Sequence, residues 1–344
     1  MAQNLIFTND VEEAIKRLQT DGNHNLTVWI ADVNTARLIP TPPYLITIPD
    51  GDTNKSLETV THVWDEMERM GVTRHSLVIN LGGGTVTDLG GFAAATFKRG
   101  VRFINVPTTL LGAVDAAVGG KTGINYQGLK NEVGVFAPAT DVVISTRFFG
   151  TLPIQEMKSG FAEVIKHAML SDREEFLHLT EHDFGAPINH EDLLERLRRS
   201  VLVKADIVAR DPNEQGERMA LNLGHTVGHA FESLAMKHGK PVPHGFAVAW
   251  GLVTEAVLSH LLLRFPSEDV HRLGAFVRGN YPGFPFTCDD YDELLDLMRH
   301  DKKSHDGEIT CTLLSDIGLY HTAQEVTPDD MTAALDILRD HIGL

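Results

Sequence analysis

The chain has 344 residues, of which 22% are charged and 42% hydrophobic, and its formal net charge is −17. This length allows two domains of ordinary size. The excess of 47 acidic over 30 basic residues argues against nucleic acid or an anionic membrane as a partner, because both require a basic surface. It does not exclude an anionic small substrate, which a local cluster of Lys and Arg can bind.

Cysteine content and apolar stretches indicate the cellular setting. Cys288 and Cys311 are too few for a disulfide framework, so we expect reduced thiols in a cytoplasmic protein. The first residues show no basic segment followed by an apolar core, so no signal peptide is predicted. The longest apolar stretch, 246–263, contains Glu255 and His260, which favours a buried helix over a membrane span.

The first 150 residues alternate short β-branched runs with helical patterns. Strands are predicted at 26–31, 44–48, 76–81, 102–106 and 141–145. A helix is predicted from about 55 to 70, where Gly71 suits its C-terminal cap. This alternation predicts an α/β domain with a mainly parallel sheet over 1–150.

From residue 151 onwards the pattern is mostly helical. Helices are predicted at about 153–170, 191–210, 217–236, 245–263, 290–302 and 326–341, with one short strand at about 308–314. The predicted fold is therefore an α/β dinucleotide-binding domain over 1–150 and a mostly α-helical metal- and substrate-binding domain over 151–344.

A glycine-rich turn, Gly82–Gly91, follows the predicted strand at 76–81 and opens a helix. Glycines let the backbone approach a ligand, and a helix N-terminus offers free N–H groups to phosphate. The dinucleotide fingerprint is incomplete, because Thr87 stands at its third glycine. A tight turn that packs helix against strand is the alternative interpretation.

A second glycine-rich stretch, 115–131, concentrates polar side chains. Gly119-Gly120-Lys121-Thr122 resembles the end of a P-loop, but the pattern needs a glycine where Asp115 stands, which argues against a nucleoside triphosphatase. The polar residues of this stretch are Asp115, Lys121, Asn125, Lys130 and Asn131. They predict a ligand-binding loop, and a solvated loop is the alternative.

A polar stripe, within 217–232, follows one face of the helix predicted at 217–236. Its members, spaced four, three, four and three apart, are Arg218, Asn222, His225, His229 and Glu232. The other faces are apolar, so the stripe must face water, a cavity or a metal. Histidines four apart can bind one metal ion, although such pairs are often only hydrogen-bonded.

Further candidate ligands lie on either side of this helix. Glu163, Lys166 and His167 share a face of the predicted helix at 153–170, and His244 begins the apolar helix. A carboxylate and two histidines with an open coordination position form a catalytic zinc set. Spacing alone leaves the choice of three ligands open.

Five segments together resemble the 3-dehydroquinate synthase family, in order and over most of the chain. They are Gly82–Phe92, Val106–Leu111, Val114–Gly123, Gly160–His167 and Leu221–Ala230. The resemblance implies a lyase of the shikimate pathway that converts 3-deoxy-D-arabino-heptulosonate 7-phosphate into 3-dehydroquinate and phosphate. It also implies NAD, one divalent metal (zinc or cobalt) and a cytoplasmic homodimer.

The resemblance implies a role for individual residues. The metal ligands are Glu163, His225 and His244. The NAD contacts are Asp32, Asp52, Lys55, Gly83, Gly84, Asp88, Thr108, Thr109, Leu111, Lys121, Lys130, Phe148, Thr151, Leu152 and Glu156. The substrate contacts are Asp115, Lys121, Lys130, Asn131, Lys166, Lys204, Arg218, Asn222, His229, one of Lys302 and Lys303, and Arg99 across a dimer interface. The catalytic residues among these are Lys121, Asn131, Lys166 and His229.

The sequence departs from the family pattern at a few positions. Asp52 replaces a common glutamate of the nucleotide site, Ala116-Ala117 replaces a Ser-Ser pair, and Phe246 replaces a frequent glutamate. None of the three departures touches a matched metal ligand or a residue of the substrate pocket. Other functions that stay open are another sugar-phosphate cyclase of the inosose or valiolone type, a metal-dependent polyol dehydrogenase, and a non-catalytic nucleotide-binding module.

Overall fold

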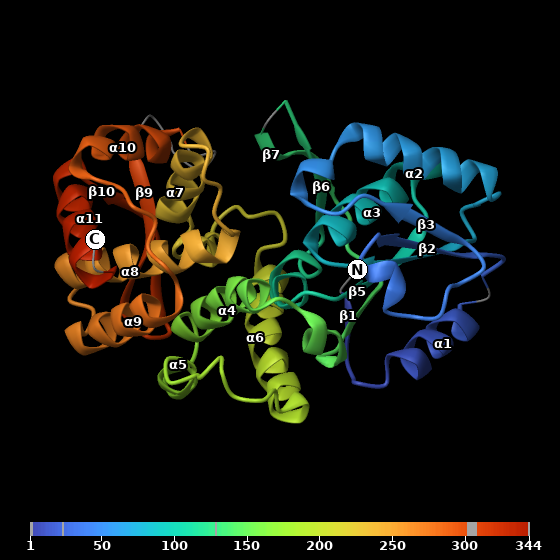
Figure 1. Ribbon diagram of the computed structural model, residues 1–344, viewed down its shortest axis with the longest axis horizontal. Coiled ribbons are helices and arrows are strands. Elements are labelled where there is room, and N and C mark those ends of the chain that lie inside the picture. Colours follow the sequence, from blue (N-terminus) through green and yellow to red (C-terminus); the bar gives the residue numbers. More distant parts are fainter. Residues whose placement is uncertain (1–2, 23, 128, 301–307, 343–344) are drawn as a thin grey trace. The chain divides into compact units, whose positions relative to one another are not determined.

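The computed structural model describes residues 3–22, 24–127, 129–300 and 308–342, which form two compact units (Figure 1). Unit 1 comprises Met1–Pro153 and Ile188–Ala205, and unit 2 comprises Ile154–Pro187 and Asp206–Leu344. The expected division near residue 150 lies close to Pro153. The segment Ile188–Ala205, which was expected in the second domain, instead groups with unit 1.

A six-stranded sheet forms the centre of unit 1, and all of its strands run parallel. In spatial order they are β1 (Asn4–Phe7), β8 (Asp141–Ile144), β5 (Arg102–Pro107), β4 (Leu77–Gly82), β2 (Thr27–Asp32) and β3 (Leu45–Ile48). This pairing confirms the predicted α/β domain with a parallel sheet. The prediction was possible because strands buried on both faces of a sheet appear in the sequence as β-branched runs. Strand β1 was not predicted from the sequence.

Helices cover both faces of this sheet. In Figure 1, α2 (Leu57–Arg69) and α3 (Gly84–Thr96) lie above the sheet and α1 (Val11–Asp21) lies below it. Ser56 caps α2 by accepting a hydrogen bond from the Thr59 amide at 3.3 Å. The predicted stop at Gly71 is confirmed, because this glycine has a φ of +75° just after the helix.

The polar stretch predicted as a loop is instead an antiparallel hairpin. Its strands are β6 (Lys121–Tyr126) and β7 (Leu129–Phe136), paired from Lys121 with Phe136 to Tyr126 with Leu129. The loop prediction was wrong because glycines interrupt the alternation of a strand. Gly134 is required there, since a Cβ atom would lie 2.3 Å from the Thr122 carbonyl oxygen.

Unit 2 is mainly helical, as predicted. Its helices include α4 (Ile154–Met169), α5 (Arg173–Leu179), α7 (His225–Lys237), α8 (His244–Leu263), α9 (Ser267–Asn280), α10 (Tyr291–Arg299) and α11 (Pro328–Ile342). The antiparallel strands β9 (Ile309–Asp316) and β10 (Leu319–Val326) pack with them. Helix α6 (His190–Arg210) belongs mostly to unit 1. By length and composition α8 could cross a membrane, but 78% of its most apolar window is buried in the protein, as is typical of a core helix.

The prediction of a single helix over 217–236 is wrong. Residues Glu217–Asn222 form a 3₁₀ helix, the chain then turns at Leu223 and Gly224, and α7 begins at His225. Gly224 has a φ of +79°, a conformation that glycine adopts at little cost. The break separates Arg218 and Asn222 from the helix that carries His225 and His229.

Candidate metal and nucleotide sites

The residues expected to contact a dinucleotide gather at the carboxyl ends of the parallel strands in unit 1. Asp32 ends β2, Gly83 follows β4, and Thr108 and Thr109 follow β5. Phe148, Thr151 and Leu152 lie in or directly after the 3₁₀ helix Arg147–Thr151 that follows β8. Open parallel sheets bind ligands at this edge, so the placement suits a nucleotide.

The glycines between β4 and α3 have a packing role. Gly83 precedes the first residue of α3, and a Cβ atom there would lie 2.9 Å from Thr109 Cγ2. At Gly82 a Cβ atom would lie 2.4 Å from Val86 Cγ2. The tight-turn interpretation is therefore supported by the geometry. Phosphate binding at the α3 N-terminus, which the same backbone would allow, stays a prediction.

A buried lysine, Lys55, connects two other expected site residues in unit 1. Lys55 Nζ donates a hydrogen bond to Asp88 Oδ2 at 2.8 Å and another to Asn131 Oδ1. Burial raises the pKa of Asp88, and the Lys55 cation opposes that rise. The backbone N–H of Asn131 donates to Asn125 Oδ1 at 3.0 Å, which joins the two strands of the hairpin, and the Lys55 bond to Asn131 ties the hairpin to this cluster.

Asp52 reaches the hairpin despite being shorter than the family's usual glutamate. Asn125 Nδ2 donates to the Asp52 carbonyl oxygen at 2.9 Å and to Oδ2 at 3.2 Å. Lys130 Nζ and Lys55 Nζ lie 3.8 Å and 3.9 Å from its carboxylate oxygens. Asp52 therefore makes a polar contact between its loop and β6–β7.

A second lysine pairs with the stretch before the hairpin. Lys204 Nζ on α6 lies 2.6 Å from both the carbonyl oxygen and Oδ1 of Asp115. Both residues were expected in the substrate pocket, and the structure brings them together within unit 1. Lys121 is exposed at the start of β6, Leu111 is half-buried, and Arg99 is exposed in a left-handed turn after α3.

Unit 2 brings together the three side chains expected to bind a metal. Glu163 of α4 is fully buried, and its Oε1 lies 3.3 Å from His225 Nε2 and 3.5 Å from His244 Nε2. The donor atoms of the three residues all lie within 4.8 Å of one another. One carboxylate and two imidazoles in this arrangement fit a catalytic zinc or cobalt ion.

The electrostatics of this group favour a cation. Burial alone would raise the pKa of Glu163, but Lys166 and His225 lower it well below its usual range. Burial and Lys166 lower the pKa of His225 to about 4, which leaves a neutral imidazole. Burial disfavours charge on His244 as well, yet Glu232 and Glu163 outweigh it and raise that pKa to about 10. The two carboxylates thus stabilise positive charge at His244, whether a proton or a metal carries it.

A second possible metal group overlaps the first. His229, Glu232 and His244 also have donor atoms within 4.8 Å of one another. The rings of His225, His229 and His244 form one cluster, with centroid separations of 5.4 Å, 5.4 Å and 6.1 Å. Among the described residues, the structure therefore offers two possible sets of three metal ligands, and His244 belongs to both.

A buried glutamate, not identified from the sequence as functional, holds the turn before His225. Glu255 Oε2 on α8 accepts a hydrogen bond from the Gly224 amide at 2.7 Å. The Glu255 side chain is fully buried in the most apolar helix of the chain. A carboxylate at such a position was the available signal, because buried charges normally have a specific partner.

The remaining expected residues of unit 2 have separate surroundings. Arg218 is buried and donates through Nη1 to the Pro212 carbonyl oxygen at 2.8 Å. Asn222 is half-buried at the end of the 3₁₀ helix, and Glu156 is exposed in the first turn of α4. Lys302 and Lys303 lie outside the described residues.

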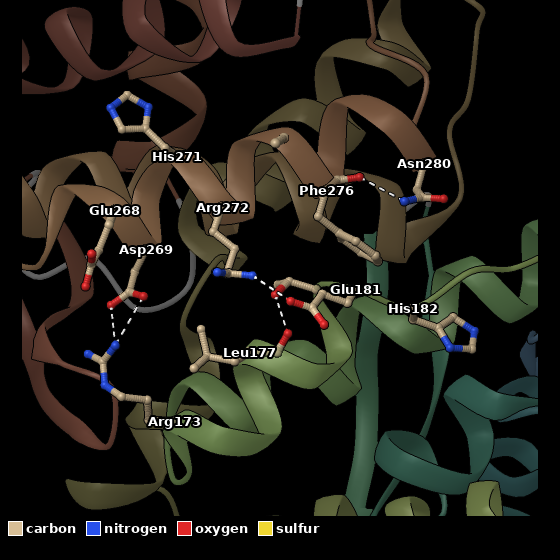
Figure 2. A pocket seen from close by; sticks show the side chains of 12 residues that line it. Arg173, Leu177, Glu181, His182, Glu268, Asp269, His271, Arg272, Phe276 and Asn280 are labelled. Carbon is tan, nitrogen blue, oxygen red and sulfur yellow. Dashed lines mark hydrogen bonds and ion pairs between the residues drawn. The ribbon is translucent and has the colours of Figure 1, made fainter.

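A surface depression of unit 2 contains none of the expected site residues. It lies between α5 and α9 and has a volume of about 900 Å³ (Figure 2). Arg173 pairs with Asp269 at 2.9 Å, and Arg272 pairs with Glu181 at 3.2 Å. Its charged side chains neutralise one another, so the depression does not show the cationic lining that a phosphorylated substrate requires.

Solved structures share this fold. A 2-deoxy-scyllo-inosose synthase complexed with carbaglucose-6-phosphate, NAD⁺ and Co²⁺ superposes with a TM-score of 0.84 at 24% identity, covering 98% of this chain and 96% of that one. The 2-epi-5-epi-valiolone synthase from Streptomyces hygroscopicus subsp. jinggangensis 5008, with NAD⁺ and Zn²⁺ bound, gives 0.85 at 26% identity over 99% and 97%. With its parallel sheet and its three-ligand group, this chain therefore has the fold of the sugar-phosphate cyclases.

Sequence comparisons show which family of that class is present. Residues 45–159 match the 3-dehydroquinate synthase N-terminal family model, and residues 160–304 match the C-terminal model. The 3-dehydroquinate synthase of Parabacteroides distasonis is 46% identical over 87% of this chain and 85% of its own length. That of Acinetobacter baylyi is 42% identical over 84% and 79%. The chain belongs to the 3-dehydroquinate synthase family.

Proposed function

We propose that this chain converts 3-deoxy-D-arabino-heptulosonate 7-phosphate into 3-dehydroquinate and phosphate, with NAD and one zinc or cobalt ion. The main support for the proposal is that Glu163, His225 and His244 lie together next to the buried Lys166. The chain is also 46% identical to a known 3-dehydroquinate synthase. Three protein ligands leave a coordination position for a substrate oxygen, as catalytic zinc sites do.

When bound, NAD would supply the redox chemistry by accepting and returning a hydride, and the metal would supply Lewis acidity toward the substrate's hydroxyl and ketone. The chain's own residues bind, orient and exchange protons. In unit 2, Glu163, His225 and His244 would hold the metal. Lys166 contacts Glu163, so it compensates the buried carboxylate and offers a cation to an anionic substrate.

His229 is the proposed proton carrier of unit 2. It is half-buried beside the rings of His225 and His244, and it is not a member of the Glu163 group. A histidine at such a position can exchange protons with a bound substrate. Arg218 and Asn222 would bind the substrate's anionic and hydroxyl groups.

In unit 1, NAD would bind at the carboxyl ends of β2, β4 and β5. The Lys55–Asp88–Asn131 cluster and the Asp115–Lys204 pair supply polar groups on this unit. Lys121 and Asn131 are proposed catalytic residues, and Lys121 and Lys130 would bind phosphate or NAD. These lysines are the feature that a polyol dehydrogenase does not need, so they favour a phosphorylated substrate.

The substrate assay distinguishes this proposal from the related cyclases. Purified protein with NAD and Zn²⁺ or Co²⁺ is given either the seven-carbon sugar acid phosphate or a sugar phosphate of equal length without the carboxylate. We expect phosphate release and a carbocyclic product only with the acid. Turnover of the carboxylate-free seven-carbon sugar alone would indicate a valiolone-type cyclase.

We also propose that the chain forms a homodimer in the cytoplasm and has no nucleic-acid or membrane partner. Arg99 is exposed, as a residue serving a neighbouring subunit would be before assembly. Arg99→Ala should lose activity, and mixing it with an inactive Lys121→Ala protein should restore part of it, because some mixed dimers carry one intact site. No recovery after verified subunit exchange would refute the shared site.

A further inference from the structure

His244 lies between two carboxylates and contacts each through a different ring nitrogen. Its Nδ1 is 3.1 Å from Glu232 Oε2, and its Nε2 is 3.5 Å from Glu163 Oε1. A neutral imidazole carries one N–H, and only the other nitrogen has a lone pair for a metal. The partner of Nδ1 therefore determines whether Nε2 is free to bind a metal in the Glu163 group.

His225 shows the same arrangement with a different acceptor. Its Nδ1 lies 3.1 Å from the Leu223 carbonyl oxygen, while its Nε2 faces Glu163. A carbonyl oxygen can only accept, so the proton of this histidine belongs on Nδ1. Both histidines that face Glu163 thus have an oxygen acceptor at Nδ1 and present Nε2 to the same carboxylate.

The competing group would use Glu232 as a metal ligand. Glu232 is buried on α7, two turns after His225, and its Oε2 already contacts His244 Nδ1. A carboxylate that accepts a hydrogen bond from a metal-binding histidine orients the ring without binding the metal itself. The geometry at His244 favours this role, because the Nδ1 contact to Glu232 is shorter than the Nε2 contact to Glu163.

We propose that Glu232 is a positioning residue: it holds His244 through Nδ1, directs Nε2 toward Glu163 and His225, and so selects that group over the one formed with His229. The inference rests on the metal site of the proposed function. It adds a residue that determines where the metal binds, while Glu232 itself stays outside the ligand set.

Cobalt titration of the metal-stripped protein tests the proposal. The probe is Co²⁺, whose visible absorption reports both affinity and coordination. Glu232→Ala should weaken Co²⁺ binding by about 10–100-fold, the range for removing a carboxylate that orients a histidine ligand. Glu232→Gln should lose less, because its amide oxygen can still accept from Nδ1. Its saturated Co²⁺ spectrum should match that of the wild type.

The controls separate positioning from ligation and from misfolding. Glu163→Ala provides the loss of affinity expected of a true ligand. Glu293→Gln on α10 removes the ion-pair partner of Lys237, which lies on α7 with Glu232, and should bind Co²⁺ like the wild type. Thermal unfolding confirms that each variant folds. If both Glu232 variants bind Co²⁺ like the wild type, or Glu232→Gln loses as much as Glu163→Ala with an altered spectrum, the positioning role is wrong. If the wild type itself binds no Co²⁺, the metal site fails and this inference fails with it.

Discussion

Replacing Gly224 by alanine tests the turn that delivers His225 to the metal group. Gly224 has a φ of +79° and lies between the 3₁₀ helix and α7. A Cβ atom there would lie 2.8 Å from Leu252 Cγ and Cδ2 and 3.0 Å from the Leu252 backbone nitrogen. The substitution therefore combines an unfavourable backbone conformation with a collision against α8.

The two costs can be separated with a glycine at the other end of the same helix. Gly239 follows α7 with a φ of +68°, and a Cβ atom there would have no neighbour within 4 Å. An alanine in the left-handed region costs about 1–2 kcal/mol, which both variants share. Overpacking against Leu252 adds about 1–3 kcal/mol to Gly224→Ala alone. The gain from restricting the unfolded chain is the same for both, so it cancels in the comparison.

Urea unfolding and Co²⁺ titration of the two variants measure the effect. We expect Gly224→Ala to lose more unfolding free energy than Gly239→Ala by about 1–3 kcal/mol, the overpacking contribution. Only Gly224→Ala should weaken Co²⁺ binding, because His225 directly follows that turn. Equal destabilisation by both substitutions, or wild-type Co²⁺ affinity in Gly224→Ala, would refute the reasoning.

Three further predictions follow from the same contacts. His225→Ala should lose bound metal after dialysis, whereas His229→Ala should keep the metal and lose turnover by about 10²–10⁴-fold; equal metal loss in elemental analysis would contradict the assigned roles. Glu255→Leu leaves the buried Gly224 amide without its acceptor and should cost about 1–3 kcal/mol in urea unfolding, more than Glu255→Gln, which can still accept. Burial and the hydrogen bond to Asp336 raise the pKa of Tyr291 to about 12. Since this lies above the ordinary value of about 10, its contribution to stability should be complete below pH ~10 and lost as the pH rises through ~12. Tyr291→Phe should reduce the loss of unfolding free energy over this pH range. It should also remove the ultraviolet signal of one tyrosine that ionises at high pH, and an unchanged ultraviolet titration would contradict the prediction.

The sheet of unit 1 was predictable because its signals are local. Buried parallel strands are continuous β-branched runs, and five of the six were recognised without reference to their neighbours. The β6–β7 hairpin was missed because Gly123 and Gly134, which the close approach of its two strands requires, interrupt the strand pattern. Glycine has the same appearance in a sequence whether it lies in a loop or in a crowded strand.

The metal group was only partly predictable for a different reason. Helical spacing identified His225 and His229 as neighbours, but it treats them alike. Their distinction depends on the contact of His225 Nε2 with Glu163, which is distant in the sequence, and on the contact of its Nδ1 with the Leu223 carbonyl oxygen. Both contacts become visible only in the fold. The turn at Gly224 was missed because the residues on both sides continue a helical period, and the tertiary contact with Glu255 overrides it.

The central claim is that the chain uses NAD as a recycled cofactor in a phosphate-eliminating cyclisation. The most direct test incubates the protein with substoichiometric NAD, Zn²⁺ or Co²⁺, and 3-deoxy-D-arabino-heptulosonate 7-phosphate, while phosphate, 3-dehydroquinate and NADH are measured together. We predict that phosphate and 3-dehydroquinate form in equal amounts, far exceed the NAD supplied, and leave no accumulated NADH. One NADH formed per product molecule, or phosphate release that stops when the NAD is consumed, would contradict the account.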